Sequence, residues 1–221
     1  MFRHVNMKAL PELVEETLST GRTYVTPEGN KYPSITTVLK VRSEEGIRAW
    51  RERVGEEEAK RVMRQASIRG TAVHELAERY LNNDPDWKKG AMPINLHTFM
   101  QLKPILDNRV DNIWAQEVPL YSDRFRIAGR VDLIAEMDGE LTVIDFKTAR
   151  KTKKSEWIDN YRLQASFYAA AFYERTQTPI RKFAILISPD GGDPQVFTGS
   201  THEHLPELLK VRKEYAAKFG A

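Results

Sequence analysis

The chain has 221 residues, of which 41% are hydrophobic and 29% are charged, a balance typical of soluble globular proteins. Its formal net charge of +3 is compatible with nucleic acid binding but does not indicate it. The absence of cysteine excludes disulfides, thiolate zinc sites and cysteine-held iron–sulfur clusters, so Asp, Glu and His remain as candidate metal ligands.

The sequence lacks the long apolar segments that mark membrane proteins. No run reaches the roughly eighteen apolar residues of a transmembrane helix. The segment Met1–Lys8 has no apolar stretch of the signal-peptide kind. We therefore expect a cytoplasmic protein with no membrane partner.

The amino-terminal elements are predicted to be short. A helix is expected over Leu10–Leu18, ending at Gly21. Residues 22–34 have the pattern of a small hairpin that turns at Pro-Glu-Gly-Asn. Ser34 is a suitable N-cap for a helix that begins with Ile35.

Residues 43–81 have a helical and highly charged pattern. Gly55 and Gly70 are expected to separate helices within it. The last of these helices places His74 and Glu78 one turn apart. Basic residues recur along the stretch: Arg48, Arg51, Arg53, Lys60, Arg61, Arg64 and Arg69. Such a run most often forms a solvated helix face.

The rest of the chain is predicted to alternate helices and strands. Expected helices cover residues 96–107, 157–174 and 205–219, and expected strands cover 113–121, 181–188 and 195–198. Between them, residues 129–148 read as two strands joined at Asp138-Gly139, the strongest short hairpin signal. The order predicts an α/β fold with a mixed sheet.

Charged residues interrupt this hairpin. Asp132 lies in its first strand, and Asp145 and Lys147 lie two apart in its second, so the latter two point to the same face. Burying such charges is costly unless they bind something, most simply a divalent cation. The backbone carbonyl of Phe146 would be a further oxygen ligand. Oxygen-rich ligation of this kind suits Mg²⁺ or Mn²⁺.

This chemistry suits phosphodiester hydrolysis, in which a metal activates water. Taken alone, Asp145-Phe-Lys147 is weak evidence, because a surface salt bridge at a strand end has the same sequence. A histidine on an apolar helix face is likewise more often a core residue than a ligand. The neighbouring motifs decide between these alternatives.

Together, these motifs resemble the PD-(D/E)xK nuclease superfamily in its RecB-like branch. Gly70-Thr-Ala-Val-His74 matches its helical Gly-x-x-x-His motif, and Glu117 matches a glutamate in the strand before the metal aspartate. Gln164 and Tyr168 match a glutamine–tyrosine helix after the catalytic strand.

The resemblance implies a role for each of these residues. Asp132, Asp145, the Phe146 carbonyl and His74 would bind the metal, and Lys147 would face the attacking water. Glu117 would be a supporting acid, and Gln164 and Tyr168 would hold Lys147 or the DNA backbone. The resemblance therefore implies a catalytic set of Asp132, Asp145, Lys147, Glu117, Gln164 and Tyr168.

A narrower likeness covers residues 33–175. This region is similar to the family of the mitochondrial genome maintenance exonuclease and its phage and bacterial relatives. The most distinctive part of the match is Asp159-Asn-x-x-x-Gln164. These relatives degrade single-stranded DNA from an end, threaded under a helical arch. Residues 43–69 would be that arch, and its basic residues would track the DNA. Thr148, Arg150, Lys151, Lys153 and Lys154 directly follow the catalytic strand and are candidate phosphate contacts, with simple solvation of this basic loop as the alternative.

The likeness implies one restriction-endonuclease-like domain over 1–221, in which residues 1–69 form the hairpin and arch and 70–221 form the core. We expect a Mg²⁺- or Mn²⁺-dependent exonuclease for single-stranded DNA in bacterial or phage replication, recombination or repair, with proteins of these pathways as possible partners. Double-strand end processing, flap or structure-selective cleavage, and a non-catalytic DNA-binding recombination module are the alternatives.

Overall fold

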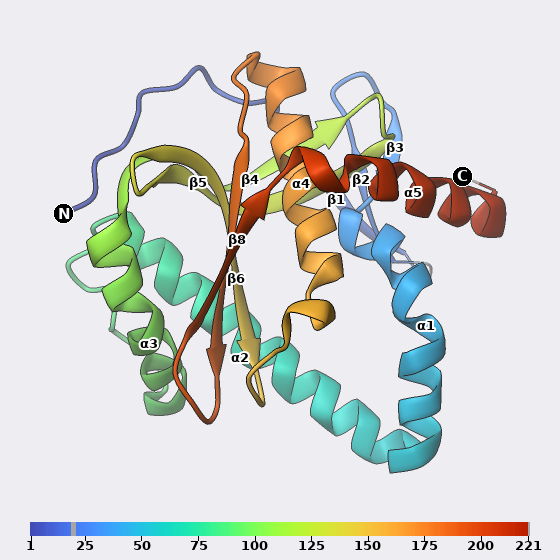
Figure 1. Ribbon diagram of the computed structural model, residues 1–221, viewed down its shortest axis with the longest axis horizontal. Coiled ribbons are helices and arrows are strands. Elements are labelled where there is room, and N and C mark those ends of the chain that lie inside the picture. Colours follow the sequence, from blue (N-terminus) through green and yellow to red (C-terminus); the bar gives the residue numbers. More distant parts are fainter. Residues whose placement is uncertain (19–20, 221) are drawn as a thin grey trace.

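A computed structural model describes residues 1–18 and 21–220, and a five-stranded sheet lies at its centre (Figure 1). The strands are β4 (Val110–Ser122), β5 (Ile127–Met137), β6 (Glu140–Ala149), β7 (Lys182–Pro189) and β8 (Gln195–Ser200), in that order across the sheet. All neighbours are antiparallel except β6 and β7. The sheet is therefore mixed, as predicted.

The parallel pair requires a crossover, which helix α4 (Asp159–Thr176) supplies after the short 3₁₀ turn η1 (Ser155–Trp157). Residues of β6 alternate between faces. Val143 belongs to the core shared with α4, whereas Ile144 and Phe146 belong to the core on the other face. This alternation directs Asp145 and Lys147 toward α4.

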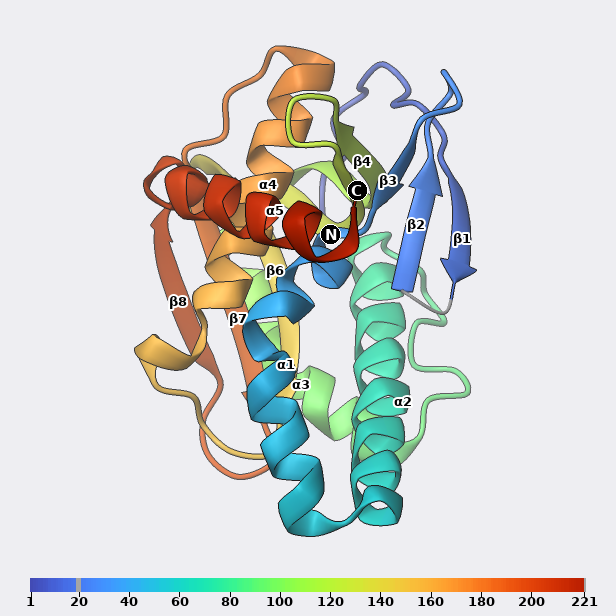
Figure 2. The same cartoon turned by 90° about the vertical axis from the view of Figure 1, so that its right-hand side faces the viewer.

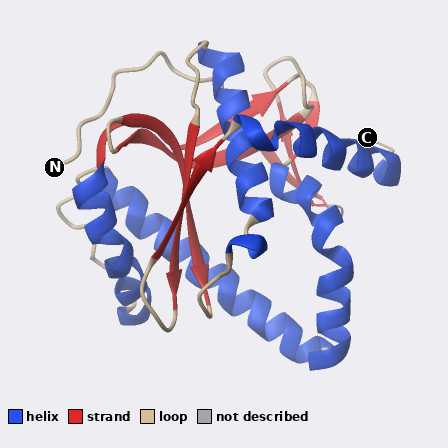
Figure 3. Ribbon diagram, viewed as in Figure 1, coloured by secondary structure: helices blue, strands red, loops and turns tan. Residues whose placement is uncertain are grey.

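Helices cover both faces of the sheet, which gives three layers (Figures 1 and 2). One core packs α1 (Ile35–Val54), α4 and α5 (Leu205–Phe219) on the sheet, and η2 (His202–His204) leads into α5. The other core packs α2 (Glu56–Leu81) and α3 (Pro93–Arg109). This architecture confirms the predicted α/β restriction-endonuclease-like fold (Figure 3).

The amino-terminal part adds a small antiparallel sheet of β1 (Val14–Leu18), β2 (Gly21–Val25) and β3 (Lys31–Pro33). The predicted hairpin is present as β2–β3. The helix predicted over Leu10–Leu18 is wrong, because residues 10–13 form no regular element and Val14–Leu18 pairs with β2 as an edge strand. Leu10, Leu13, Val14 and Leu18 have the spacing of a helix face, but pairing with β2 decides the conformation of Val14–Leu18.

The charged stretch forms two helices with one break. Ser34 caps α1, and its hydroxyl accepts a hydrogen bond from the Thr37 amide at 3.0 Å. Gly55 separates α1 from α2 with a φ of 87°, as predicted. The break predicted at Gly70 is wrong, because α2 continues through it. A glycine costs a helix interior only about 1 kcal/mol, which good helix formers on both sides offset.

The continuity of α2 also bears on the proposed division of the chain. A boundary between residues 69 and 70 would cut this helix, so the division into an arch and a core remains a prediction about function. Among the described residues, no helix is both long and apolar enough to cross a membrane.

Candidate active site

The charged residues of the central hairpin meet where β5 and β6 stop pairing. Leu133 and Ile144 are the last paired residues, and Asp132 and Asp145 lie one step beyond them. Asp132 is 7% exposed and Asp145 is completely buried. Two carboxylates therefore share a largely dry position, which is costly without compensating charge.

Lys147 supplies part of that compensation. Its ammonium is in ion-pair contact with Asp145 Oδ2; the Asp145 carboxylate is buried and the Lys147 side chain is half-buried. Burial raises the pKa of the Asp145 carboxyl to about 6, and the charge of Lys147 opposes this rise. Burial also disfavours the Lys147 ammonium, but Asp145 and Asp132 outweigh burial and raise the pKa of Lys147 above its ordinary value. Lys147 is therefore a cation at neutral pH.

Tyr161 in α4 completes the surroundings of Lys147. The Lys147 Nζ lies 5.1 Å from the centre of the Tyr161 ring, within the range of a cation–π contact. Sequence reasoning missed this residue. The sequence did contain a pattern that would have identified it: Tyr161 precedes Gln164 by about one helical turn, so the two residues share one side of α4.

His74 reaches the same position from α2. Its Nε2 donates to the Phe146 carbonyl at 2.9 Å, and its Nδ1 lies 3.6 Å from Asp132 Oδ1 and 3.7 Å from Glu117 Oε1. The Phe146 amide donates to Asp132 Oδ2 at 2.8 Å. The residues predicted from the hairpin and from the Gly-x-x-x-His motif are thus brought together.

The charge state of His74 follows from these neighbours. Burial favours the neutral ring, but the Asp132 charge and the hydrogen bond with Glu117 outweigh it and raise the pKa of His74 to about 9. Without a metal, the imidazolium therefore balances the negative charge of Asp132 and Glu117.

Glu117 occupies its place with an unusual backbone. Its φ is 50°, in the left-handed region that a residue with a side chain rarely adopts inside a strand. Arg130 donates to the Glu117 carbonyl at 2.5 Å and so fastens this conformation. Left-handed residues outside glycine often mark functional positions, which supports a role for the Glu117 carboxylate.

These side chains provide candidate ligands for a divalent metal ion. One ligand atom each from His74, Glu117 and Asp132 lies within 4.8 Å of the others. Asp145 Oδ1 is buried and accepts no hydrogen bond within the described part of the chain, so it has a lone pair to offer. This donor set, mostly oxygen, suits Mg²⁺ or Mn²⁺. Glu117, predicted only as a supporting acid, thus lies among the candidate ligands.

A cavity of about 370 Å³ opens onto this cluster and includes Gln164 and Tyr168 in its lining. The Gln164 amide donates to the Tyr168 hydroxyl at 3.4 Å. Among the residues that the structure describes, neither one is hydrogen-bonded to Lys147, so their contact with a DNA backbone stays a prediction. Arg22 and Arg130 also line the cavity and were not predicted. The position of Arg130 could have been predicted, since it lies two residues before Asp132 on the same strand and therefore on the same face of the sheet.

The basic residues predicted to track DNA divide into two groups. Arg48, Arg53 and Arg64 are exposed on α1 and α2, and Arg51 is half-buried against Met63. The others are paired: Lys60 with Glu56 and Glu57, Arg61 with Glu58, and Arg69 with Asp190 and the Ala149 carbonyl. The paired residues also fit the alternative of an ordinary solvated helix surface.

The basic loop follows β6 directly. Arg150, Lys151 and Lys154 are exposed, whereas Thr148 and Lys153 are half-buried. The backbone of Lys153 is held by Gln195, with a hydrogen bond in each direction. Lys154 lies 5.5 Å from the ring centre of the exposed Trp157. These contacts leave the phosphate contacts of the loop a prediction.

Comparisons with known proteins place the chain among its relatives. Residues 109–218 match the family model of the PD-(D/E)XK nuclease superfamily. Among solved structures, a candidate exonuclease from Eubacterium rectale is similar, with 14% identity, a TM-score of 0.40 and coverage of 68% of each chain. A search of curated proteins found no match.

Proposed function

Because the chain belongs to the PD-(D/E)XK nuclease superfamily, we propose that it is a divalent-metal-dependent deoxyribonuclease that degrades single-stranded DNA from a free end. The observation that carries this proposal is the convergence of His74, Glu117, Asp132 and Lys147 at one cavity, with the buried Asp145 paired to Lys147.

His74, Glu117, Asp132 and Asp145 would hold Mg²⁺ or Mn²⁺. When bound, such an ion polarises a phosphoryl oxygen and lowers the pKa of a water molecule. The ligands come from α2, β4, β5 and β6, so the fold fixes their relative positions before the metal binds.

Lys147 acts here as a cation. Because its pKa is raised, it donates hydrogen bonds and stabilises negative charge on the phosphoryl oxygens rather than accepting a proton. Its contacts with Asp145 and Tyr161 keep the ammonium in one place, which reduces reorganisation during the reaction. Arg22 and Arg130 provide positive charge for flanking phosphates at the cavity wall.

The single-strand and end preferences rest on the sequence likeness and on the position of the α1–α2 hairpin. Figure 1 shows α1 and α2 meeting at a turn that lies beyond the end of the sheet. Arg48, Arg53 and Arg64 are exposed on this hairpin and suit contacts along a flexible DNA backbone. Mg²⁺ or Mn²⁺ as cofactor, and a role in replication, recombination or repair, are parts of the same proposal.

Replacement of the catalytic lysine tests the proposed chemistry. Lys147→Ala is expected to lower the nuclease rate by roughly 10²–10⁴-fold, because charge stabilisation is lost at the phosphoryl group. The control is Lys182→Ala, which removes an exposed lysine from β7. The rate is measured with purified proteins and Mn²⁺, after circular dichroism shows that both variants are folded. Wild-type rates in Lys147→Ala would contradict the assignment.

The choice of substrate needs a separate experiment. Linear single-stranded DNA, labelled in turn at each end, is compared with circular single-stranded DNA and blunt duplex. Degradation of the linear strand alone is expected, and the order in which label is released gives the polarity. Cutting of the circle would show endonuclease activity, and preference for the duplex would show double-strand end processing. Binding without any product in Mn²⁺ would favour the non-catalytic module.

A further inference from the structure

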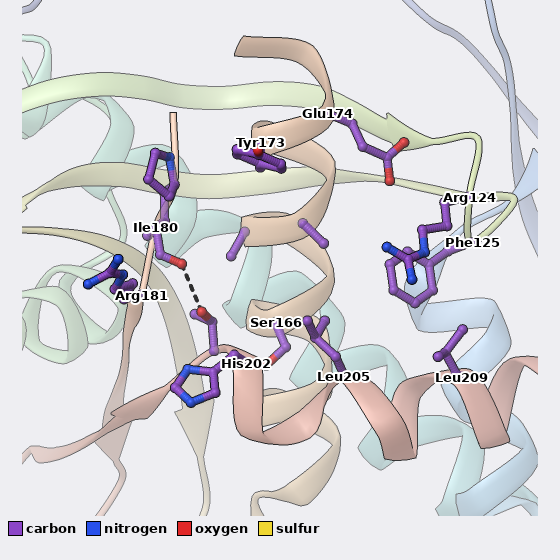
Figure 4. A pocket seen from close by; sticks show the side chains of 14 residues that line it. Arg124, Phe125, Ser166, Tyr173, Glu174, Ile180, Arg181, His202, Leu205 and Leu209 are labelled. Carbon is purple, nitrogen blue, oxygen red and sulfur yellow. Dashed lines mark hydrogen bonds between the residues drawn. The ribbon is translucent and has the colours of Figure 1, made fainter. Parts of the chain in front are cut away.

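A second cavity, of about 570 Å³, lies on the side of α4 that faces away from the active site. Gln164 and Tyr168 face the active site, whereas Ser166, Ala169 and Tyr173 of the same helix line the second cavity. The walls are mostly apolar. They come from the β4–β5 turn, the segment before β7, and the start of α5: Phe125, Pro179, Ile180, Leu205 and Leu209 (Figure 4).

Apolar surface remains exposed here. Tyr173 is 48% exposed and Leu209 is 38% exposed, although both lie beside buried core residues. The Ser166 hydroxyl is buried and has no hydrogen-bond partner among the described residues. Buried hydroxyls in folded proteins normally have a partner, so this hydroxyl is available to a ligand that enters the cavity.

Among the described residues, the unpaired charged groups that line the groove have one sign. Arg124 and Arg181 lie on opposite sides of α4, and both are exposed (Figure 4). Within the described residues, neither guanidinium has a hydrogen bond or an ion pair. Glu174, the carboxylate in the lining, is already held by the Ser122 hydroxyl, the Asp123 amide and Arg175. The available charge is therefore positive at both ends of an apolar floor.

We propose that this groove binds a short peptide segment of a partner protein that combines apolar side chains with carboxylates. The apolar side chains would fill the floor, and the carboxylates would pair with Arg124 and Arg181. The Ser166 hydroxyl would bond to the peptide backbone. The site is separate from the proposed nuclease centre, so a partner could occupy it while DNA is being degraded.

The shape and chemistry favour a peptide over single-stranded DNA. Bases bind by stacking on aromatic faces, whereas this floor is lined mainly by aliphatic side chains. Isoleucine, leucine and proline walls instead match the apolar side chains of a peptide.

Fluorescence anisotropy tests the proposal directly. The probe is a labelled synthetic peptide of alternating Glu and Leu, compared with a Lys–Leu peptide and a Glu–Ser peptide of equal length. The intact protein is expected to bind the Glu–Leu peptide most tightly. Arg124→Glu, Arg181→Glu and Leu209→Asp are each expected to weaken it about tenfold or more. The control is Lys213→Glu, an exposed charge reversal on α5 outside the lining.

Other results would overturn the proposal. They are equal binding of the Lys–Leu peptide, no binding of the Glu–Leu peptide, or variants that bind as well as wild type. If a labelled single-stranded oligonucleotide loses affinity in Arg124→Glu while the peptide does not, the groove is a nucleic acid surface. If Leu209→Asp converts a dimer to a monomer in light scattering, the groove is an interface between copies. Nuclease rates of these variants are expected to equal wild type.

Discussion

Asp145 illustrates how individual residues of the site depend on one another. Its carboxylate is fully buried, and a buried charge without partners is strongly disfavoured. Lys147 offsets this cost, and the raised pKa of Asp145, about 6, shows that the compensation is incomplete. A site with an unsatisfied carboxylate oxygen is prepared for a cation, and that is what the proposed chemistry requires.

His74 makes the stability of the metal-free protein depend on pH. Its pKa is about 9 in the folded state and about 6.5 when unfolded, so its contribution is fully present below pH 6.5. That contribution is lost as the pH rises through 9. In a chelator, the free energy of unfolding is expected to fall by on the order of 3 kcal/mol over this range through His74 alone. Urea denaturation at a series of pH values measures it.

The matched variant for this measurement is His74→Gln, which keeps a polar side chain but cannot titrate. Its free energy of unfolding should change less between pH 6.5 and 9 than that of the wild type. The difference between the two pH profiles isolates the histidine from all other groups. Parallel profiles would show that His74 is not the imidazolium described here.

Single residues of the site could be predicted where the two-residue alternation of a β-strand or a matched sequence motif determined their positions. Asp132, Asp145 and Lys147 were found because charges interrupt apolar strands, and His74 because of the glycine four residues before it. Arg22 could not be found in this way. Its place in the cavity depends on how β2 packs against the core, and no local pattern encodes that contact.

At the scale of elements, Gly70 has a use other than ending a helix. It lies inside α2 and lines a neighbouring cavity of about 340 Å³ that also includes His74 and Glu117 in its lining, and nothing lies within 4 Å of the position that a Cβ would take. We expect Gly70→Ala to stabilise the protein by roughly 0.5–1 kcal/mol, because alanine is the better helix former. The added methyl group should also narrow the cavity and lower the nuclease rate. Thermal unfolding and a nuclease assay measure the two effects.

Gly46 provides the control for this prediction. It also lies inside a helix, α1, with open space at its Cβ position, but it does not line the cavity. Gly46→Ala should therefore give a similar gain in stability with an unchanged rate. Equal rates for both variants would show that the space beside Gly70 is not used by the substrate.

Most elements were predictable because their patterns are strong. The turn at Asp138-Gly139 predicted that β5 and β6 form a hairpin, and the apolar run over residues 181–188 predicted β7. The helix prediction for Leu10–Leu18 was wrong because the conformation of Val14–Leu18 is decided by pairing with β2. A local helical pattern in the sequence does not contain that information. The predicted helix break at Gly70 was wrong because a glycine weakens a helix without necessarily ending it.

For the whole molecule, metal binding should appear as added stability. A cation that binds only the folded state stabilises it by about 2.7 kcal/mol at a hundredfold excess over Kd, which raises Tm by roughly 5–10 °C. Mn²⁺ is expected to produce such a shift in the wild type and a smaller one in Glu117→Gln. Differential scanning calorimetry, with and without a chelator, measures the shift.

Glu140→Gln is the matched control, since Glu140 is an exposed carboxylate paired with Lys182 at the far end of β6. It should respond to Mn²⁺ as the wild type does. The same shift in Glu117→Gln and wild type would remove Glu117 from the ligands. No shift in any protein would contradict the metal site itself.

The unbroken course of α2 has a mechanical consequence. The helix spans 26 residues, about 39 Å, with exposed Arg64 in its first half and His74 in its second. A rod without a hinge tilts as one piece, so a push on its outer end displaces the inner end as well. If single-stranded DNA binds at the α1–α2 hairpin, as proposed, a tilt of α2 would therefore also move the His74 imidazole. In this way α2 would couple DNA binding at the hairpin to the position of His74.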